Sequence, residues 1–434
     1  MTETRQPATA RRDHRGRHRV AVTGIGLVTP LGLGVAESWS ALLAGRSGIR
    51  RITRFPTAHL KTTIAGQVTL PEEAGDALTS PARVERMAAL AAAEAIGTAG
   101  LGEEGRFPGP LFLGMPPVEV EWPHRIALAK QLQGQRPDGE AMRYPALAAA
   151  ATGQRQLFEQ CLFGGVGERL AARFGTAGAP IAISTACATG ATAIQLGVEA
   201  IQRGEAAAAL CLGAEGSVQP EALIRFSLLS ALSTRNEEPE RASRPFEKNR
   251  EGFVMSEGAA ALVLESLEGA LARGAPVLGL VLGCGERADS FHRTRSNPDG
   301  GAIIGAMRAA IADAGLEPAA IDYVNAHGTG TPENDKMETL GMRAVFGEAC
   351  PPISSNKSMI GHTLSAAGAI EAVFSLLAIR DGMLPPTINH ETPDPAIPLD
   401  VVPNQARPAA VRHVLSNSFG FGGQNVCLVL GAAD

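Results

Sequence analysis

Residues 190–204 read GATAIQLGVEAIQRG, and residues 368–382 read GAIEAVFSLLAIRDG. Both stretches begin with Gly-Ala, space their apolar side chains three or four residues apart, and end at a glycine. This pattern is typical of a helix with one apolar face and a glycine just past its last turn. A short strand-like run precedes each stretch, at 181–184 and at 353–355. The repeat predicts an α/β chain built from two similar halves.

The composition agrees with a large α/β protein. The chain has 434 residues, of which 45% are hydrophobic but only 4% aromatic, and it holds 50 glycines and 29 prolines. Its core must therefore pack mainly aliphatic side chains, with many tight turns. The formal net charge is −5, so we expect no nucleic-acid partner, which would favour a basic excess.

The N-terminal sequence, the lack of long apolar stretches and the cysteines indicate the cellular compartment. No stretch approaches the roughly 20 apolar residues of a transmembrane segment, and the N-terminus lacks the apolar region of a secretory signal. Six dispersed cysteines without a C-x-x-C pair favour a reduced, cytoplasmic protein. The arginine-rich residues 1–18 predict a disordered basic tail. Residues 107–175, rich in proline at their start, predict an irregular excursion over the core.

The first chemical motif is Ser184-Thr-Ala-Cys-Ala-Thr-Gly190, where a strand turns into the first repeated helix. Unpaired backbone N–H groups and the helix dipole favour an anion there, so we expect a lowered thiol pKa and a nucleophilic Cys187. The alternative is a small buried cysteine, which suits the others. These are Cys161, Cys211, Cys284, Cys350 and Cys427.

Two further motifs carry histidines. His327 lies in NAHGTGTP, after a strand-like run, where it either donates hydrogen bonds into a cleft or is satisfied by neighbouring backbone. His362 lies in SNKSMIGHTLSAAG, at the start of the second repeated helix. On that helix Glu371 is placed to reach back toward Lys357, as an ordinary ion pair or as a support for the site.

Two glycine-rich stretches lead to different predictions: the first suggests a ligand-binding loop, and the second does not. Residues 417–423, NSFGFGG, let backbone N–H groups approach a ligand closely and give Phe421 a hinge; the alternative is a turn with a core phenylalanine. Residues 20–24 predict a short strand followed by a glycine turn. Thr29 stands where a dinucleotide loop needs its third glycine, so we expect no NAD or FAD. The remaining histidines show no metal-ligand spacing, so no metal is expected.

Several long motifs in one order resemble the β-ketoacyl-ACP synthases of the 3-oxoacyl-ACP synthase II type, in the thiolase superfamily. They are TACATG (185–190), LSTRN (232–236), ASRPFEKNREGFVMSEGA (242–259), YVNAHGTGTPENDKME (323–338), SSNKSMIGHTLSAAGA (354–369) and SNSFGFGG (416–423). The resemblance implies a thiolase-like fold, two pseudo-repeated halves in five α-β-α-β-α layers. The halves would cover residues 19–274 and 275–434. It also implies a homodimer.

The resemblance further implies the reaction. Cys187 would hold an acyl chain, and His327 and His362 would assist a decarboxylative condensation with malonyl-ACP. The products would be CO2 and 3-oxoacyl-ACP, two carbons longer. No cofactor is implied, because acyl carrier protein brings both substrates on its phosphopantetheine. Other roles carried over are oxyanion binding and gating (Phe421, Gly422), acyl or pantetheine contact (Phe226, Thr329, Thr331), and support (Lys357, Glu371).

This chain departs from the family at several points. Residues 113–175 are unlike the housekeeping enzyme, Ser230 replaces an arginine near the carrier entrance, and Gln424 replaces a threonine. The amino-acid sequence as a whole most resembles paralogues that build very long acyl chains for lipid A. One alternative is a non-catalytic chain-length factor, but those usually lack the cysteine nucleophile. Another is a thiolase, but the loop around Phe421 lacks the second catalytic cysteine of thiolases.

Overall fold

The computed structural model describes residues 11–71, 79–102, 105–117, 120–131, 153, 158–159 and 162–433. Its main sheet divides into two five-stranded paths. The strands of the first path, in spatial order, are β6 (Ile181–Ile183), β5 (Leu111–Gly114), β7 (Ala208–Glu215), β8 (Gly258–Ser266) and β1 (Val20–Thr29). β6, β5 and β7 are parallel, whereas β7, β8 and β1 pair antiparallel.

The second path repeats the first. Its strands, in spatial order, are β11 (Ile353–Ser354), β10 (Tyr323–Asn325), β14 (His413–Phe419), β15 (Gln424–Gly431) and β9 (Gly279–Ala288). Again the first three are parallel and the last three pair antiparallel. β1 and β9 join the two paths by a short antiparallel ladder, in which Val20 faces Val281 and Val22 faces Gly279. The pseudo-repeat predicted from the two helices is therefore confirmed.

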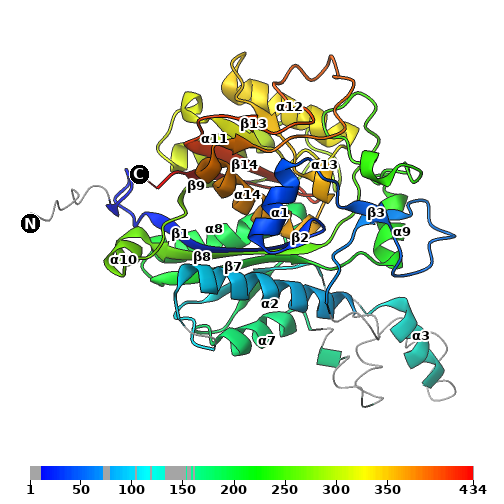
Figure 1. Ribbon diagram of the computed structural model, residues 1–434, viewed down its shortest axis with the longest axis horizontal. Coiled ribbons are helices and arrows are strands. Elements are labelled where there is room, and N and C mark those ends of the chain that lie inside the picture. Colours follow the sequence, from blue (N-terminus) through cyan, green and yellow to red (C-terminus); the bar gives the residue numbers. More distant parts are fainter. Residues whose placement is uncertain are drawn as a thin grey trace, which may run out of the picture.

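Helices cover and separate the two paths to make five layers (Figure 1). α2 (Ser80–Ala99) and α7 (Gly165–Phe174) cover the outer side of the first path. α8 (Thr189–Gln202) and α14 (Ala367–Asp381), the two repeated helices, lie between the paths. α11 (Gly301–Asp313) and α12 (Pro332–Phe346) cover the second path. The α-β-α-β-α arrangement of a thiolase-like fold is confirmed.

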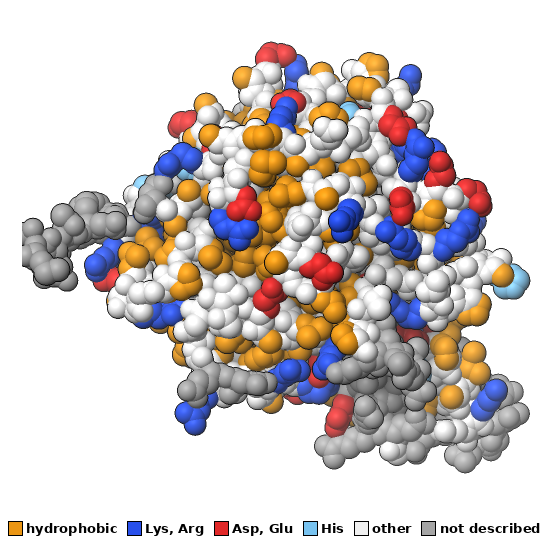
Figure 2. All heavy atoms as spheres, viewed as in Figure 1, with side chains coloured by type: hydrophobic (Ala, Val, Ile, Leu, Met, Phe, Trp, Pro, Cys, Tyr) orange, Lys and Arg blue, Asp and Glu red, His pale blue; other side chains and the backbone are white. Residues whose placement is uncertain are grey.

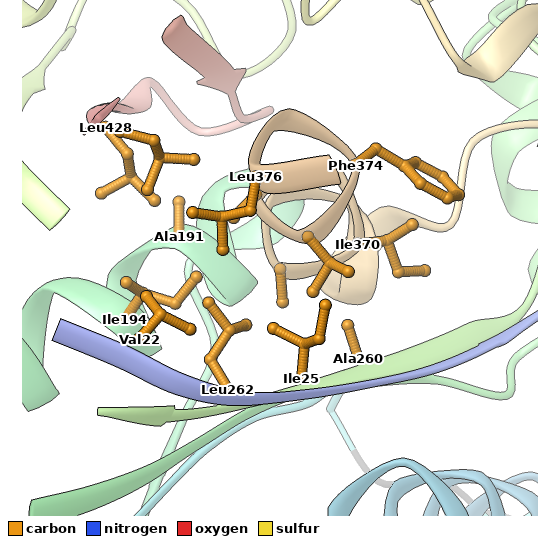
Figure 3. Close-up of a cluster of buried hydrophobic side chains, with 14 of the residues drawn as sticks. Val22, Ile25, Ala191, Ile194, Ala260, Leu262, Ile370, Phe374, Leu376 and Leu428 are labelled. Carbon is orange, nitrogen blue, oxygen red and sulfur yellow. The ribbon is translucent and has the colours of Figure 1, made fainter. Parts of the chain in front are cut away.

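Strand alternation explains the layers. On β8, Leu262 and Leu264 pack toward α8 and α14, whereas Ala261 and Val263, which alternate with them, pack with α2. Figure 3 shows the central layer, where the aliphatic side chains of α8 and α14 meet those of β1, β8 and β15. Phe374 is the one ring among the labelled side chains, which agrees with the low aromatic content.

The other described elements are short. They are β2 (Gly32–Leu33), α1 (Val35–Leu43), β3 (Ile49–Arg51), β4 (Ile64–Gly66), α3 (Trp122–Gln131), α9 (Pro220–Leu228), α10 (Leu267–Ala272), α13 (Lys357–Ile360), β12 (Met383–Leu384) and β13 (Arg407–Pro408). Over the described residues, no helix has the length and apolar character needed to cross a membrane. Acidic and basic side chains are interspersed on the face drawn in Figure 2.

Three sequence expectations need correction. Residues 11–18 are not a disordered tail: Arg12 bridges to His18, and Arg15 pairs with Asp313 at 2.8 Å; residues 1–10 lie outside the described part. The expected glycine turn at Gly24 is absent, because β1 continues to Thr29. A Cβ on Gly24 would lie 2.0 Å from the Ala95 carbonyl oxygen, so this glycine lets α2 approach the strand.

The expected excursion over residues 107–175 is also partly wrong. Its described residues include β5, a fully buried strand between β6 and β7, and the helix α7. Proline and glycine around the short strand hid its pairing from sequence reasoning. Residues 118–119, 132–152, 154–157 and 160–161 of this region lie outside the described part.

Candidate active site

Cys187 lies on a strained turn between β6 and α8. The turn is the 3₁₀ segment η2 (Ala186–Ala188), and Ala186 has φ +50°, which is costly for a residue with a Cβ. The hydroxyl of Thr189 accepts from the Thr185 N–H at 2.8 Å and so stabilises the turn. Cys187 is 7% exposed. The fold thus holds a nearly buried thiol immediately before the first turn of a central helix.

His362 reaches the same point from the second half. Its backbone is fixed to the segment that precedes β8: the His362 N–H donates to the Val254 carbonyl at 2.7 Å, and the Ser256 N–H donates to the His362 carbonyl at 3.0 Å. The His362 Nε2 lies 3.0 Å from Cys187 Sγ. Its Nδ1 has no hydrogen-bond partner among the described residues, so no neighbour there selects one tautomer.

His327 follows β10 and is fixed from two sides. The Glu338 carboxylate accepts from the N–H groups of His327 (2.9 Å) and Gly328 (2.7 Å). Lys357 Nζ lies 3.5 Å from His327 Nδ1 and forms the expected buried ion pair with Glu371. An ammonium beside Nδ1 favours the tautomer with its proton on Nε2. His327 is therefore set as a hydrogen-bond donor.

The three groups converge. The two imidazole rings have centroids 5.3 Å apart, at an interplanar angle of 83°. The Cys187 Sγ and one ring nitrogen from each of His327 and His362 all lie within 4.8 Å of one another. In geometric terms these atoms could also hold a metal ion, and a bound ion would occupy the lone pairs that acid–base chemistry needs.

The protonation states follow from burial. Burial raises the pKa of the Cys187 thiol to about 11, although the Phe421 N–H and the Lys357 charge act in the opposite direction. The expectation of a lowered thiol pKa is therefore wrong, because the loss of water outweighs the Phe421 N–H and the charge of Lys357. Burial, and then the charge of Lys357, lower the pKa of His327 and of His362 well below the ordinary value. The resting site holds a neutral thiol beside two neutral imidazoles.

Two cavities meet at the sulfur. One, of about 490 Å³, is lined mainly by apolar side chains, including Phe226, Val84 and Met115. The other, of about 400 Å³, is more polar and includes Thr329 and Thr331. Four residues line both cavities: Cys187, Leu229, Leu364 and Phe421. The arrangement suits a reaction that joins an apolar chain to a polar carrier.

The glycine-rich loop supplies backbone near the sulfur. Gly422 and Gly423 have φ +90° and +88°, so both need glycine, and a Cβ on Gly423 would lie 1.9 Å from the Asp289 carbonyl oxygen. This geometry brings the Phe421 N–H against Cys187. Ser230 lies exposed on the wall of the polar cavity, and Gln424 begins β15 after the loop.

Sequence reasoning missed several neighbours. Phe253, inside a quoted motif, stacks edge-on with both Phe226 (5.5 Å) and His362 (5.1 Å). Glu338 follows His327 by eleven residues in another quoted motif, and a carboxylate on the next helix was a usable signal. Leu229 and Gln219 gave no signal, because only the fold brings α9 to the cavity.

Comparison with known proteins identifies the family. Residues 17–270 match the N-terminal domain of beta-ketoacyl synthases and residues 278–391 match the C-terminal domain. The chain belongs to the β-ketoacyl synthase family. It is 39% identical to 3-oxoacyl-[acyl-carrier-protein] synthase 2 of Coxiella burnetii over 95% of this chain and 98% of that protein. The Synechocystis protein of the same name is 38% identical over 95% and 97%.

Solved structures agree. The ishigamide ketosynthase/chain length factor has a TM-score of 0.82 at 36% identity, over 96% of this chain and all of that chain. A beta-ketoacyl synthase from Burkholderia phymatum has a TM-score of 0.80 at 33% identity, with the same coverage. A type II polyketide synthase ketosynthase, solved with its acyl-carrier protein and bound to a hexaketide, has a TM-score of 0.82 at 31% identity. This β-ketoacyl synthase is therefore an acyl-transferring condensing enzyme.

Proposed function

We propose that this β-ketoacyl synthase condenses a Cys187-bound acyl chain with malonyl-ACP, releasing CO2 and 3-oxoacyl-ACP. The observation that carries the proposal is the 3.0 Å contact between Cys187 Sγ and His362 Nε2, at the point where the two cavities meet. A thiol with a raised pKa needs a base at the moment of attack. A neutral imidazole in contact with it can act as that base.

In the first half-reaction Cys187 Sγ attacks the acyl thioester while His362 Nε2 takes the thiol proton. The carbonyl oxygen becomes an anion, for which the N–H groups of Phe421 and Cys187 are the proposed donors. As the carbon–sulfur bond to the carrier breaks, the leaving pantetheine sulfur takes the proton from His362. The chain stays on Cys187, in the apolar cavity beside Phe226.

In the second half-reaction the malonyl group occupies the polar cavity. The bond to its carboxylate breaks and CO2 leaves, so the electron pair passes onto the thioester oxygen as an enolate. A hydrogen bond from His327 Nε2 stabilises that oxygen, and His362 adds a second one in the tautomer that carries its proton on Nε2. The enolate carbon then attacks the acyl-Cys187 carbonyl, and the new carbon–carbon bond forms as the bond to Cys187 Sγ breaks. The sulfur leaves as a thiolate and takes a proton from water, which restores the resting thiol. Thr329 and Thr331 are the proposed contacts for the pantetheine arm; Lys357 and Glu371 fix His327.

The finer parts of the proposal have different support. Acyl carrier protein as the partner is supported by the relatives' names and by the ketosynthase solved with its carrier. A homodimer is supported by β6, which ends the described sheet with Ile181 45% exposed. The relatives' names do not address very long chains for lipid A. That role, the cytoplasmic location and the absence of any cofactor remain predictions.

One assay tests the proposed condensation directly and separates it from the behaviour of a non-catalytic chain-length factor. Purified protein is given acyl-ACP and malonyl-ACP labelled in its free carboxyl group, with release of labelled CO2 and the mass of the ACP product measured. We expect CO2 release matched by a product two carbons longer than the acyl donor. Acyl-ACP that stays unchanged, with no adduct on Cys187 by intact-protein mass spectrometry, would reject the enzyme assignment.

A further inference from the structure

Gln219 stands out in the wall of the apolar cavity. It is 6% exposed, and its Oε1 is buried without a hydrogen-bond partner among the described residues. Its Nε2 also makes no hydrogen bond to a described residue, but unlike Oε1 it is not fully buried. Buried side-chain amides normally have partners, since an unmet group loses its contacts with water and gains nothing in return. The cavity thus contains one amide with its hydrogen-bonding capacity unused.

The buried carboxylate of this wall, by contrast, is satisfied. The Glu215 carboxylate accepts from the N–H groups of Ser217 (2.9 Å) and Ser365 (3.2 Å). The Gln219 side chain also does not stabilise its own helix. It occupies the N-cap position of α9, where its side chain makes no capping bond, and glutamine is not among the favoured capping residues. Neither a structural network nor helix stability accounts for an amide at this position.

A plain hydrocarbon chain would leave the amide unpaired. An oxygen on the chain would accept a hydrogen bond from the Gln219 Nε2–H group. We propose that the apolar cavity accepts an acyl chain that carries a hydroxyl or keto oxygen away from the thioester, and that Gln219 selects it. This inference rests on the proposed function, because it concerns the chain held on Cys187.

The test measures acylation of Cys187 by intact-protein mass spectrometry on the full-length chain. The probes are decanoyl-pantetheine and its hydroxy and keto derivatives, with the oxygen on successive carbons of the outer half. We expect the wild type to prefer at least one oxygenated isomer over decanoyl by about tenfold, as the pairing of one buried polar group predicts. Gln219→Leu should lose that preference, chiefly by accepting decanoyl faster.

The controls keep the outcomes apart. Gln219→Met tests the same loss with a side chain of similar length, in case the leucine variant does not fold. Gln202→Leu, at the end of α8 and outside both cavities, should keep the wild-type ratio. Equal ratios in wild type and both Gln219 variants would overturn the inference but leave the condensing activity standing. No acylation of folded wild type by any thioester would overturn the proposed function and the inference together.

Discussion

The turn that carries Cys187 and the turn that follows His362 have the same backbone conformation but different chemical roles. In the first, Ala186 has φ +50° and begins η2, which leads into α8. In the second, Leu364 has φ +40° and begins η5 (Leu364–Ala366), which leads into α14. Ser365 occupies the position of Cys187. The repeat therefore built the same strained turn twice, and only one copy holds a nucleophile.

The comparison explains why a single site lies between two halves. One half supplies the sulfur, and the other supplies both histidines and uses its own turn as a wall, since Leu364 lines both cavities. Backbone strain alone thus does not mark a catalytic residue. What distinguishes Cys187 is its contact with His362 at 3.0 Å.

The largest effect is expected when the equivalent side chains of the two turns, Cys187 and Ser365, are replaced in turn. Cys187→Ala should lower condensation by at least about 10³-fold, because no covalent acyl intermediate can form. Malonyl decarboxylation should persist, since both histidines remain. Ser365→Ala should reduce condensation by no more than a few fold. The measurements are labelled CO2 and product mass. Comparable losses in the two variants would mean that the turns act together, not as nucleophile and wall.

The next largest effect should distinguish the two histidines, because each is proposed to support a different step. His362→Ala should slow acylation of Cys187 by about 10²- to 10⁴-fold, since it removes the proposed base. His327→Ala should leave acylation within a few fold but slow decarboxylation. The hydrogen bond to the sulfur comes from His362, whereas His327 is held as a donor by Lys357. Single-turnover acylation and CO2 release are measured separately for each variant. Acylation lost equally in both would contradict the division of roles.

The raised thiol pKa gives a smaller, graded effect. Because the thiolate fraction grows with pH up to the pKa of about 11, alkylation of Cys187 by iodoacetamide should rise about tenfold per pH unit across the neutral range. The Cys187→Ser variant supplies the background from the other thiols. An alkylation rate that is already constant from pH 7 to 8 would mean that Cys187 is a thiolate at neutral pH. Burial would then not control the thiol pKa, and the lowered pKa expected from the helix terminus would be correct.

How much the sequence predicted depends on the range of the interaction. The repeated helices, Cys187, both histidines and the Lys357–Glu371 pair were readable because each lies in a motif whose local pattern sets its position. The thiol pKa was not, because burial of the sulfur depends on residues from both halves. β5 was missed because four residues between prolines pair only through distant strands. Gln219 was missed because only tertiary structure shows which amide is unpartnered.

The smallest effect concerns how closely the two repeated helices approach. A Cβ on Gly190 would lie 2.6 Å from the Ala369 nitrogen, and one on Gly368 would lie 2.7 Å from the Ala191 nitrogen. Backbone atoms cannot yield as a flexible side chain can, so Gly368→Ala should lower the free energy of unfolding by about 1–3 kcal/mol. Gly97→Ala is the matched control on α2, where a Cβ meets nothing within 4 Å. That change should raise stability by about 0.5–1 kcal/mol through helix propensity. Chemical denaturation of both variants gives the sign directly. Equal stabilisation would mean that α8 and α14 have room to separate, and the near-contact that brings the two strained turns together would lose its explanation.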